Sequence, residues 1–361
     1  DDVQTTQAAR AYAGAQIRVH AVPPSLPRTK PKAMNHALAA MPVDAIGDII
    51  TIYDAEDRPH PGQLKQAAQS FAANPELAAV QAPLRIDNIR ASMLSAMFAL
   101  EYAALFYVWN PAMARLGLPF PLGGTSNHIR KSALLAAGGW DANNVTEDAD
   151  LAFRISALTP TTKLGCISRP TGEEAVATLK DWHNQRARWL KGFMQTWRVH
   201  MRRKTAAPNG GRVHAKAKAK TFLSLQITLG ATLLAAFLHV PSILVLNGMF
   251  AADILGAVDG VWKLSLLIVL CSGYGAAMLL GVMGAVRARQ AYLLWFVPLM
   301  PFYWLLYFWP ALLAAYDIIV RPSHWRKTAH IGRPKTGQDT EINSAAPPCT
   351  SVKNTQFVSN T

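Results

Sequence analysis

The chain has 361 residues, of which 51% are apolar and only 16% are charged, and its formal net charge is +14. An apolar half excludes a chain that is disordered throughout, and three scattered cysteines exclude a disulfide scaffold and a cysteine-based zinc site. The positive mean hydropathy with so little charge indicates membrane segments, and the basic excess fits either nucleic acid or the cytoplasmic face of a membrane.

Strands and helices alternate over about the first 170 residues. The β-branched run 17–22, the apolar run 48–53 and residues 77–81 are predicted strands. Residues 32–41 and 62–73 are predicted helices that connect them. This alternation predicts an α/β fold with helices on the faces of a sheet.

A long apolar helix is predicted over residues 92–108. Its length approaches that of a membrane span, but Glu101 lies in its middle and Asn110-Pro111 is expected to end it. We therefore predict a helix that packs against a core or an interface instead of crossing a membrane.

Three long apolar segments predict a transmembrane region over residues 221–320. Residues 222–246 and 264–286 contain no charged residue and reach the roughly 20 residues that a bilayer-spanning helix needs. Residues 292–320 contain three prolines and are long for one span, so they predict a kinked span, a re-entrant hairpin, or a span with an interfacial helix. Residues 321–361 are predicted to be a basic, largely disordered tail.

The basic residues gather beside the first predicted span. Residues 1–197 carry 19 Lys and Arg against 17 Asp and Glu, whereas residues 198–220 carry eight basic residues and no acid. A basic segment next to a span stays in the cytoplasm, so residues 201–220 predict a cytoplasmic juxtamembrane segment and a cytoplasmic domain over residues 1–200. Residues 198–220 contain no nucleic-acid-binding motif, and no nucleic acid partner is predicted.

Three carboxylates lie within four residues of the end of the apolar run 48–53. Asp54, Glu56 and Asp57 are candidate ligands for Mg²⁺ or Mn²⁺, because ligands of open α/β sheets bind beyond the carboxyl ends of strands and hard cations prefer carboxylates. Such an ion would clamp a diphosphate. A solvated acidic turn is the competing interpretation.

A second acidic stretch, Thr146-Glu147-Asp148-Ala149-Asp150, precedes the apolar residues of a predicted helix. Threonine followed by acids is typical of helix capping, which is the simpler interpretation of this stretch by itself. A carboxylate held beside a sugar hydroxyl could instead act as a general base.

A glycine-rich loop lies between the two acidic stretches. Gly124 lets the backbone approach a ligand closely, and Thr125 next to it offers a hydroxyl for hydrogen bonding. An ordinary turn fits these residues equally well.

The stretch 185–192 combines phosphate-binding and sugar-stacking groups. Arg188 carries a guanidinium fork that suits phosphate oxygens, and the Trp189 ring offers a face on which a sugar can stack. An amphipathic helix at about 178–201, lying in the membrane interface, would explain the same residues, and both interpretations can hold together.

The order of these motifs is more specific than any one of them. The acidic cluster, the Gly-Thr loop, Gly138-Gly139-Trp140, the Thr-Glu-Asp, the Gln-x-x-Arg-Trp and the spans together resemble the family 2 glycosyltransferases of the cellulose and hyaluronan synthase type. Bacterial inner-membrane members with a YDAED-type motif are the most similar, and Trp325 to His330 match their C-terminal signature. The resemblance implies a GT-A-like nucleotide-sugar transferase domain that is N-terminally incomplete, followed by α-helical transmembrane segments.

The resemblance also implies a role for each matching residue. Asp148 matches the catalytic base, and Asp54, Glu56 and Asp57 match the metal ligands, although Glu56 stands where the family has aspartate. The nucleotide-sugar site is implied to contain Asp1, Asp2, Lys30, Lys32, Asn35 and Arg188. The acceptor site is implied to contain Gly124, Thr125, Glu147, Gln185 and Trp189.

The activity implied by the resemblance is an inverting, metal-dependent transfer of sugar from a UDP-sugar to a polysaccharide, with synthesis and export across a bacterial inner membrane. Two alternatives stay open: a single-sugar transferase for a lipid-linked or membrane acceptor, and a truncated, non-catalytic membrane partner. The expected partners are a nucleotide-sugar donor, a glycan or lipid-linked acceptor, the membrane, and export proteins of unknown identity.

Overall fold

The computed structural model describes residues 3–14, 17–41, 47–159, 161–202, 212–254 and 260–321. All of these residues belong to one compact unit, Asp1–Thr328. Four features predicted from the sequence lie wholly or partly outside the described residues: the pair Asp1 and Asp2, residues 203–211 of the juxtamembrane segment, the signature from Trp325 to His330, and the remainder of the basic tail.

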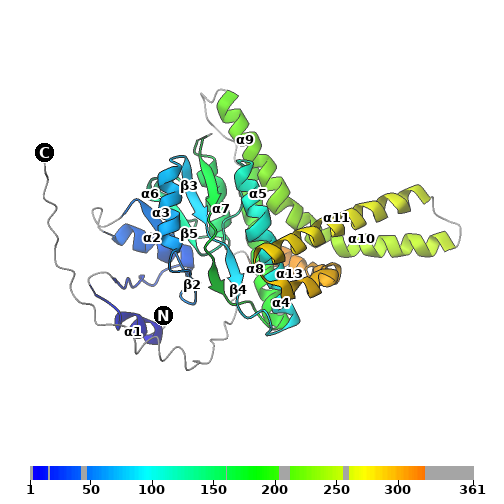
Figure 1. The fold of residues 1–361 in the computed structure, drawn as a ribbon, viewed down its shortest axis with the longest axis horizontal. Coiled ribbons are helices and arrows are strands. Elements are labelled where there is room, and N and C mark those ends of the chain that lie inside the picture. Colours follow the sequence, from blue (N-terminus) through cyan, green and yellow to red (C-terminus); the bar gives the residue numbers. More distant parts are fainter. Residues whose placement is uncertain are drawn as a thin grey trace. The chain divides into compact units, whose positions relative to one another are not determined.

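A four-stranded mixed sheet forms the centre of the domain (Figure 1). Its strands lie in the order β1 (Ile49–Ile52), β5 (Asn127–Arg130), β3 (Leu77–Gln81) and β6 (Lys163–Cys166). Strand β5 runs antiparallel to β1 and β3, whereas β6 runs parallel to β3. The central position of β3 explains why four of its five residues are buried.

Helices cover both faces of this sheet. Val80 on β3 packs against Ala67 and Phe71 of α3 (Gln63–Ala73), while its neighbour Ala79 belongs to the core on the opposite face. That second core also contains Leu151 from α7 (Glu147–Ser156). Adjacent strand residues point to opposite faces, so the apolar strands are buried between two helix layers. The predicted α/β fold is therefore confirmed.

Shorter helices and a second sheet complete the domain. Helices α2 (Lys30–Ala40) and α6 (Lys131–Ala136) pack against the main sheet, whereas α1 (Val3–Arg10) lies apart from it (Figure 1). The second sheet has the order β2 (Arg58–Pro59), β7 (Thr171–Glu173) and β4 (Leu84–Ile86). Because β2 begins one residue after Asp57, this small sheet adjoins the acidic end of β1.

The run 17–22 forms no strand within the described residues, contrary to the prediction. None of its side chains is buried, and Ile17 is 52% exposed. A β-branched run without a buried face and without a ladder partner gains too little to form a strand, because strand preference reflects packing against neighbours.

The predicted apolar helix continues past its expected end. It comprises α4 (Met93–Ala104), a π-helical turn (Leu105–Trp109) and α5 (Asn110–Arg115). Pro111 cannot donate to the carbonyl of Tyr107, and Arg287 Nη1 donates to that carbonyl instead, at 3.2 Å. The helix is therefore not broken by Asn110-Pro111, as had been predicted, because another side chain satisfies the carbonyl that proline leaves unbonded.

The predicted packing of this helix against a core is confirmed. Phe98 and Leu100 are fully buried. Its other side contacts the membrane helix α11 (Gly260–Arg287) so closely that a Cβ on Gly284 would lie 2.7 Å from the carbonyl oxygen of Ala103.

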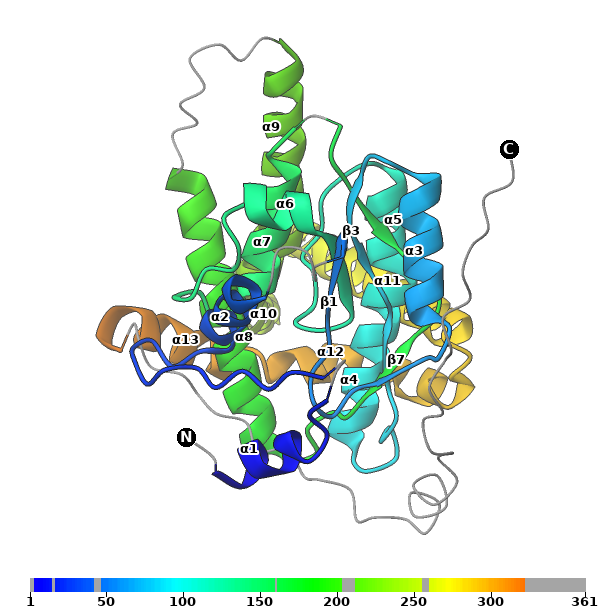
Figure 2. The ribbon, with the colours of Figure 1, turned by 90° about the vertical axis from the view of Figure 1, so that its left-hand side faces the viewer.

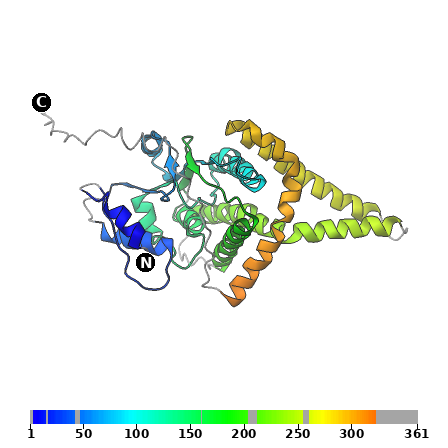
Figure 3. The same cartoon turned by 90° about the horizontal axis from the view of Figure 1, so that it is seen from below.

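Long apolar helices occupy the predicted transmembrane region. Helix α9 (Arg212–Leu225) continues through a π-helical turn (Gln226–Gly230) into α10 (Ala231–Ile254). Figures 1 and 3 show α10 and α11 side by side. By length and composition, Lys218–Ala252 and Gly260–Arg287 can each cross a membrane. The chain is therefore a membrane protein.

The third apolar segment is bent. A 3₁₀ helix (Ala291–Leu299) and α12 (Met300–Leu305) form its first part, and α13 (Phe308–Val320) lies at 41° to that part. Prolines in each part explain the interruption, because each removes a backbone donor. The segment counts as a third span if the bent pair crosses together, and the choice between a kinked span and a re-entrant hairpin stays a prediction.

Candidate active site

The acidic motif at the end of β1 is tied to the glycine-rich loop. The backbone N–H of Asp54 donates to Asp57 Oδ2 at 2.8 Å and to Thr125 Oγ1 at 3.2 Å. The Thr125 hydroxyl also donates to Asp57 Oδ2. Asp57 Oδ1 is buried without a hydrogen-bond partner, and burial raises the pKa of this carboxyl. The turn therefore holds Asp57 in one orientation and leaves one of its oxygens available.

Lys30 joins three parts of the site. Its ammonium, at the first residue of α2, forms an ion pair with Asp54 Oδ1 and donates to the carbonyl of Gly124 at 2.8 Å. About a third of the Lys30 and Asp54 side chains is exposed, so an incoming ligand can reach both. A cation is thus already favoured beside Asp54.

The structure brings together two of the three predicted metal ligands. Asp54 and Asp57 are half-buried and share the same turn, whereas Glu56 between them is exposed. Across the described part of the chain, no three His, Cys, Asp or Glu side chains converge closely enough to hold a metal ion. The arrangement fits a cation held by two carboxylates together with oxygens of a ligand, and not a closed three-carboxylate cage.

The second acidic motif opens α7, but its threonine does not cap the helix. Thr146 occupies the N-cap position without a side-chain cap hydrogen bond. The glycine-rich loop comes close to the next turn, since a Cβ on Gly124 would lie 3.6 Å from Asp148 Oδ2. Simple capping therefore does not explain the motif, and its middle carboxylate faces the loop that also holds Asp57.

Burial raises the pKa of both Glu147 and Asp148, and the positive charges of Lys30 and Arg188 act in the opposite direction. Arg188 in turn interacts electrostatically with Glu147, Asp148 and Asp54. The two acidic motifs, the lysine of α2 and the arginine of α8 (Leu179–Arg202) therefore form one electrostatic set.

Asp150, the last acid of the motif, stabilises the fold through hydrogen bonds and ion pairs. Asp150 is 3% exposed and accepts from Arg154 Nε at 2.6 Å and from His200 Nε2 at 2.9 Å. Arg154 Nη1 also donates to the carbonyl of Gly139 at 2.7 Å. Burial alone would raise the pKa of Asp150, but these partners lower it. Asp150 thus connects α7 to α8 and to the Gly-Gly-Trp loop.

Helix α8 runs along the loop that precedes α7. Asn144 Nδ2 donates to Thr196 Oγ1 at 2.9 Å. A Cβ on Gly192 would lie only 2.8 Å from the Cβ of Thr146, so only glycine allows this approach. This close approach holds α8, which carries Arg188, against the start of the second acidic motif.

We expect Gly192→Ala to lower the rate of the reaction at this site. The added methyl group must displace α8 or Thr146, which costs about 1–3 kcal/mol, and Asp148 follows Thr146 by two residues. A displacement of about 1 Å can cost roughly 10²-fold in rate. Gly273→Ala is the matched control, because its Cβ would meet nothing within 4 Å. Equal activity of the two variants would contradict the predicted contact.

Of the remaining predicted residues, two lie on α8 with Arg188 and two have their partners elsewhere. Gln185 is buried with its Oε1 unbonded, and Trp189 is half-buried. Asn35 instead binds the backbone of Trp140, donating to its carbonyl at 2.7 Å and accepting from its N–H at 3.0 Å. Lys32 donates to the carbonyl of Ser25 at 2.5 Å. The structure therefore does not bring Lys32 or Asn35 to the acidic cluster.

Glu173, at the end of β7, was not predicted from the sequence. Its Oε2 is buried without a hydrogen-bond partner. Burial raises its pKa to about 8, and the negative charges of Asp57, Asp54 and Glu56 act in the same direction. Glu173 also raises the pKa of the buried Tyr102 phenol, as does Asp148 to a smaller extent. Only its position after a short strand could have drawn attention to it in the sequence.

We expect Glu173→Gln to stabilise the metal-free protein at alkaline pH. A carboxyl with a raised pKa in the fold contributes its full stability below about 4.3, the value of a free glutamate, and loses it as the pH rises through the folded value of about 8. Glutamine cannot ionise, so it avoids this loss, which we expect to be about 1–3 kcal/mol.

Thermal unfolding in detergent with a chelator measures this effect. At a pH greater than 8, the variant is expected to have a higher unfolding temperature than the unchanged protein. Near pH 4 the two unfolding temperatures are expected to be equal. Glu174→Gln is the control, because its carboxylate lies 4.0 Å from Arg58 Nη2. A difference between Glu173→Gln and the unchanged protein that did not vary with pH would contradict the prediction.

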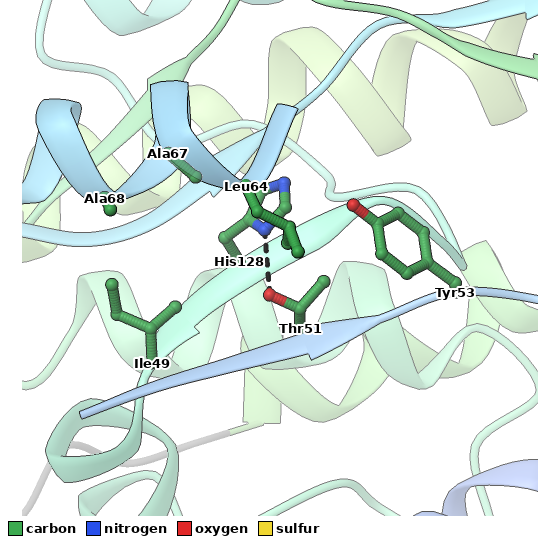
Figure 4. Close-up of a pocket in the computed structure, with 7 residues that line it drawn as sticks. All are labelled: Ile49, Thr51, Tyr53, Leu64, Ala67, Ala68 and His128. Carbon is green, nitrogen blue, oxygen red and sulfur yellow. Dashed lines mark hydrogen bonds between the residues drawn. The ribbon is translucent and has the colours of Figure 1, made fainter. Parts of the chain in front are cut away.

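A pocket lies on the α3 side of β1, next to the acidic cluster but not lined by it (Figure 4). Its lining residues are Ile49, Thr51, Tyr53, Leu64, Ala67, Ala68 and His128. His128 Nδ1 and Thr51 Oγ1 are 2.9 Å apart, and burial lowers the His128 pKa to about 4, so the imidazole is neutral at pH 7. The pocket therefore offers no charged group for a nucleotide or a metal, and the candidate site is the polar cluster beside it.

Residues 49–318 match the sequence model of Glycosyl transferase family group 2. The match covers more than half of the chain and includes both acidic motifs, the glycine-rich loop and α8. The chain belongs to this family. The predicted family 2 membership is thus confirmed, and the narrower cellulose and hyaluronan synthase type stays a prediction.

Two curated proteins are similar to parts of this chain. Beta-monoglucosyldiacylglycerol synthase of Synechocystis is 29% identical over 202 residues, which are 55% of this chain and 40% of that protein. Probable glucomannan 4-beta-mannosyltransferase 1 of Arabidopsis thaliana is 32% identical over 126 residues, which are 35% of this chain and 23% of that protein. The chain therefore spans two-fifths or less of the curated relatives it matches.

A solved structure is also similar. It is the mannosyltransferase PcManGT from Pyrobaculum calidifontis, in complex with GDP-Man and Mn²⁺, which matches at TM-score 0.42 and 19% identity. The likeness covers 81% of this chain and 67% of that one.

Proposed function

We propose that this protein is a membrane-bound glycosyltransferase that moves a sugar from a nucleotide-sugar donor to an acceptor hydroxyl. One observation carries the proposal. The half-buried side chain of Asp148 faces the loop of Gly124, and that loop also contacts Lys30 and Asp57 at the acidic end of β1. A base and a site for a diphosphate therefore lie on two sides of one backbone loop, as transfer to a hydroxyl requires.

The residues at the end of β1 fit a divalent cation, which we propose to be Mg²⁺ or Mn²⁺. Asp54 already attracts the ammonium of Lys30, and Asp57 Oδ1 is a buried carboxylate oxygen without a partner. Asp54 and Asp57 would hold the ion, and the ion would supply Lewis-acid stabilisation of the leaving diphosphate. Glu56, exposed beside them, completes the acidic cluster.

Asp148 is the proposed general base. It accepts the proton of the acceptor hydroxyl, whose oxygen forms a bond to the anomeric carbon while the bond from that carbon to the diphosphate breaks. The diphosphate leaves with the electron pair, and the attack from the opposite face inverts the anomeric centre. Lys30 and Arg188 lie close enough to Asp148 to influence its charge and would also attract the diphosphate.

The acceptor lies, in this proposal, against α8. Trp189 offers a half-buried aromatic face for a sugar, and Gln185 has a buried oxygen that can accept a hydroxyl proton. Gly124 and Thr125 line the opposite side, and Glu147 lies beside the base. Arg188 extends toward the donor phosphates.

The donor is proposed to be a UDP-sugar and the product a polysaccharide exported across a bacterial inner membrane. The basic residues before the first apolar helix support a cytoplasmic catalytic domain, where nucleotide sugars are made. A single transfer to a lipid acceptor is the second candidate, because one similar protein is a glucosyldiacylglycerol synthase. A glucomannan mannosyltransferase among the similar proteins favours a glycan product.

Purified full-length protein in detergent tests the proposal. We expect release of nucleoside diphosphate from UDP-glucose or GDP-mannose with Mg²⁺ or Mn²⁺, and loss of that release with a chelator. Radiolabelled donor then separates a long glycan from a single sugar on lipid. No release from any nucleotide sugar would contradict the proposed activity and favour a non-catalytic membrane partner.

A further inference from the structure

A charged cluster surrounds Arg186, which lies on the same helix as Arg188 and Trp189. Arg186 is only 2% exposed, and its Nη2 donates to Glu101 Oε2 at 2.5 Å. The hydroxyl of Tyr303 donates to the same oxygen at 2.9 Å, and the hydroxyl of Tyr307 donates to Glu101 Oε1. Trp182 Nε1 donates to the Tyr303 oxygen at 2.8 Å. Both oxygens of Glu101 are thus held by donors from other elements.

The cluster joins the catalytic domain to the bent apolar segment (Figure 2). Glu101 belongs to α4, Arg186 to α8 and Tyr303 to α12. Tyr307 lies in the break between α12 and α13, where the segment bends by 41°. Tyr303 therefore joins the bent segment directly to Trp182 and Arg186 of α8, while Tyr307 joins the break to Glu101 of α4.

Arg186, which is bonded to Glu101 and Tyr303, also packs against Trp189. Its guanidinium carbon lies 4.4 Å from the ring centroids of both Trp189 and Phe98. The Trp189 ring is also parallel to that of Tyr102, with an interplanar angle of 10° and a centroid distance of 6.3 Å. Arg186 and Tyr102 therefore both lie against the indole, and its orientation depends on where Glu101 holds Arg186.

Stability alone is a weak explanation for such a cluster. Burial by itself would lower the pKa of Arg186, and the neighbouring Glu101 raises it, so the guanidinium stays charged. Taking the Arg186 guanidinium fully and the Glu101 carboxylate largely out of water is costly, and apolar residues of the same volume often stabilise a fold as well or better. Apolar residues cannot form the hydrogen bonds that fix Arg186 beside the Trp189 ring.

We infer that Glu101, Arg186, Tyr303 and Tyr307 are positioning residues through which the bent membrane segment sets the orientation of Trp189 and thereby the affinity for the acceptor. This inference rests on the proposed function. It assigns the two tyrosines of the apolar segment to acceptor binding, although neither belongs to the motifs of the catalytic domain.

The test uses the full-length protein with the variants Tyr303→Phe and Tyr307→Phe, singly and together. Manno-oligosaccharide and diacylglycerol serve as acceptor probes, and UDP-glucose and GDP-mannose as donors. We expect the double variant to raise the acceptor KM about tenfold or more, with the donor KM and the metal-dependent hydrolysis of donor without acceptor unchanged. Glu101→Gln is expected to act in the same direction, because the neutral amide holds Arg186 less firmly.

Tyr316→Phe is the matched control, since Tyr316 lies on α13 with its ring 47% exposed. An unchanged acceptor KM in the tyrosine variants would overturn the inference, as would an equal loss of donor hydrolysis. The single variants each remove one hydroxyl only, which keeps the test valid if the double variant folds poorly. Absence of donor hydrolysis in the unchanged protein would instead contradict the proposed function.

Discussion

We expect Asp148→Asn to lower the rate of sugar transfer by about 10²–10⁴-fold, the contribution typical of a positioned general base. Asparagine keeps the size of the side chain but cannot accept the proton of the acceptor hydroxyl. Lys30, Asp54 and Asp57, which would bind the donor, do not depend on that proton. Donor affinity, measured by equilibrium binding of the nucleotide sugar, is therefore expected to stay close to that of the unchanged protein.

The pH dependence of the rate gives an independent test of Asp148. Only its ionised form can act as a base, so activity falls as the pH drops through its pKa. Burial raises that pKa above the roughly 3.9 of a free aspartate, and Lys30 and Arg188 only partly oppose the shift. The acid limb of the rate profile is expected above pH ~3.9.

Two results would contradict this role for Asp148. One is turnover by Asp148→Asn at the rate of the unchanged protein, and the other is the same acid limb in both proteins. Glu76→Gln is the control substitution, because Glu76 is an exposed carboxylate paired with Lys163 at the far end of β3. A loss of rate in that control would point to general damage from removing an acid.

The parts of the site that were predicted from the sequence are those that local patterns determine. Carboxylates that directly follow an apolar strand lie at the carboxyl edge of the sheet. The pattern alone therefore predicted the position of Asp54 and Asp57. The resemblance to family 2 glycosyltransferases, which rests on the order of the motifs, then implied that Asp148 and Arg188 join them. The long uncharged runs likewise predicted the apolar helices, because length and composition decide that property.

The rest depends on contacts between residues far apart in the chain. Asn35 binds the Trp140 backbone, 105 residues away, and no local pattern indicates such a partner. The Arg287 side chain that satisfies the Tyr107 carbonyl is 180 residues away, so the continuation of the helix past Pro111 was not predictable from its own sequence. Glu173 was not singled out in the sequence, and only the fold reveals its buried oxygen at the end of β7.

We expect Asp57→Asn and Asp54→Asn to lower metal-dependent release of nucleoside diphosphate by about 10²–10³-fold, the loss typical when one group that stabilises developing charge is removed. Asp57→Asn removes the carboxylate whose second oxygen is buried and unbonded, while an amide can still accept from Thr125. Asp54→Asn weakens the ion pair with Lys30 as well. Glu56→Gln is expected to have a smaller effect, because Glu56 is exposed.

Titration with Mn²⁺ distinguishes loss of metal from loss of structure. If Asp54 and Asp57 hold the ion, each variant needs more Mn²⁺ for half of its maximal rate, and its unfolding temperature without metal changes little. Glu76→Gln again serves as the control. An unchanged Mn²⁺ requirement in both aspartate variants would contradict the two-carboxylate site. A large shift in Glu56→Gln alone would show that the exposed side chain turns inward when the ion and the diphosphate bind, because a flexible glutamate can reach a site that the shorter aspartates already border.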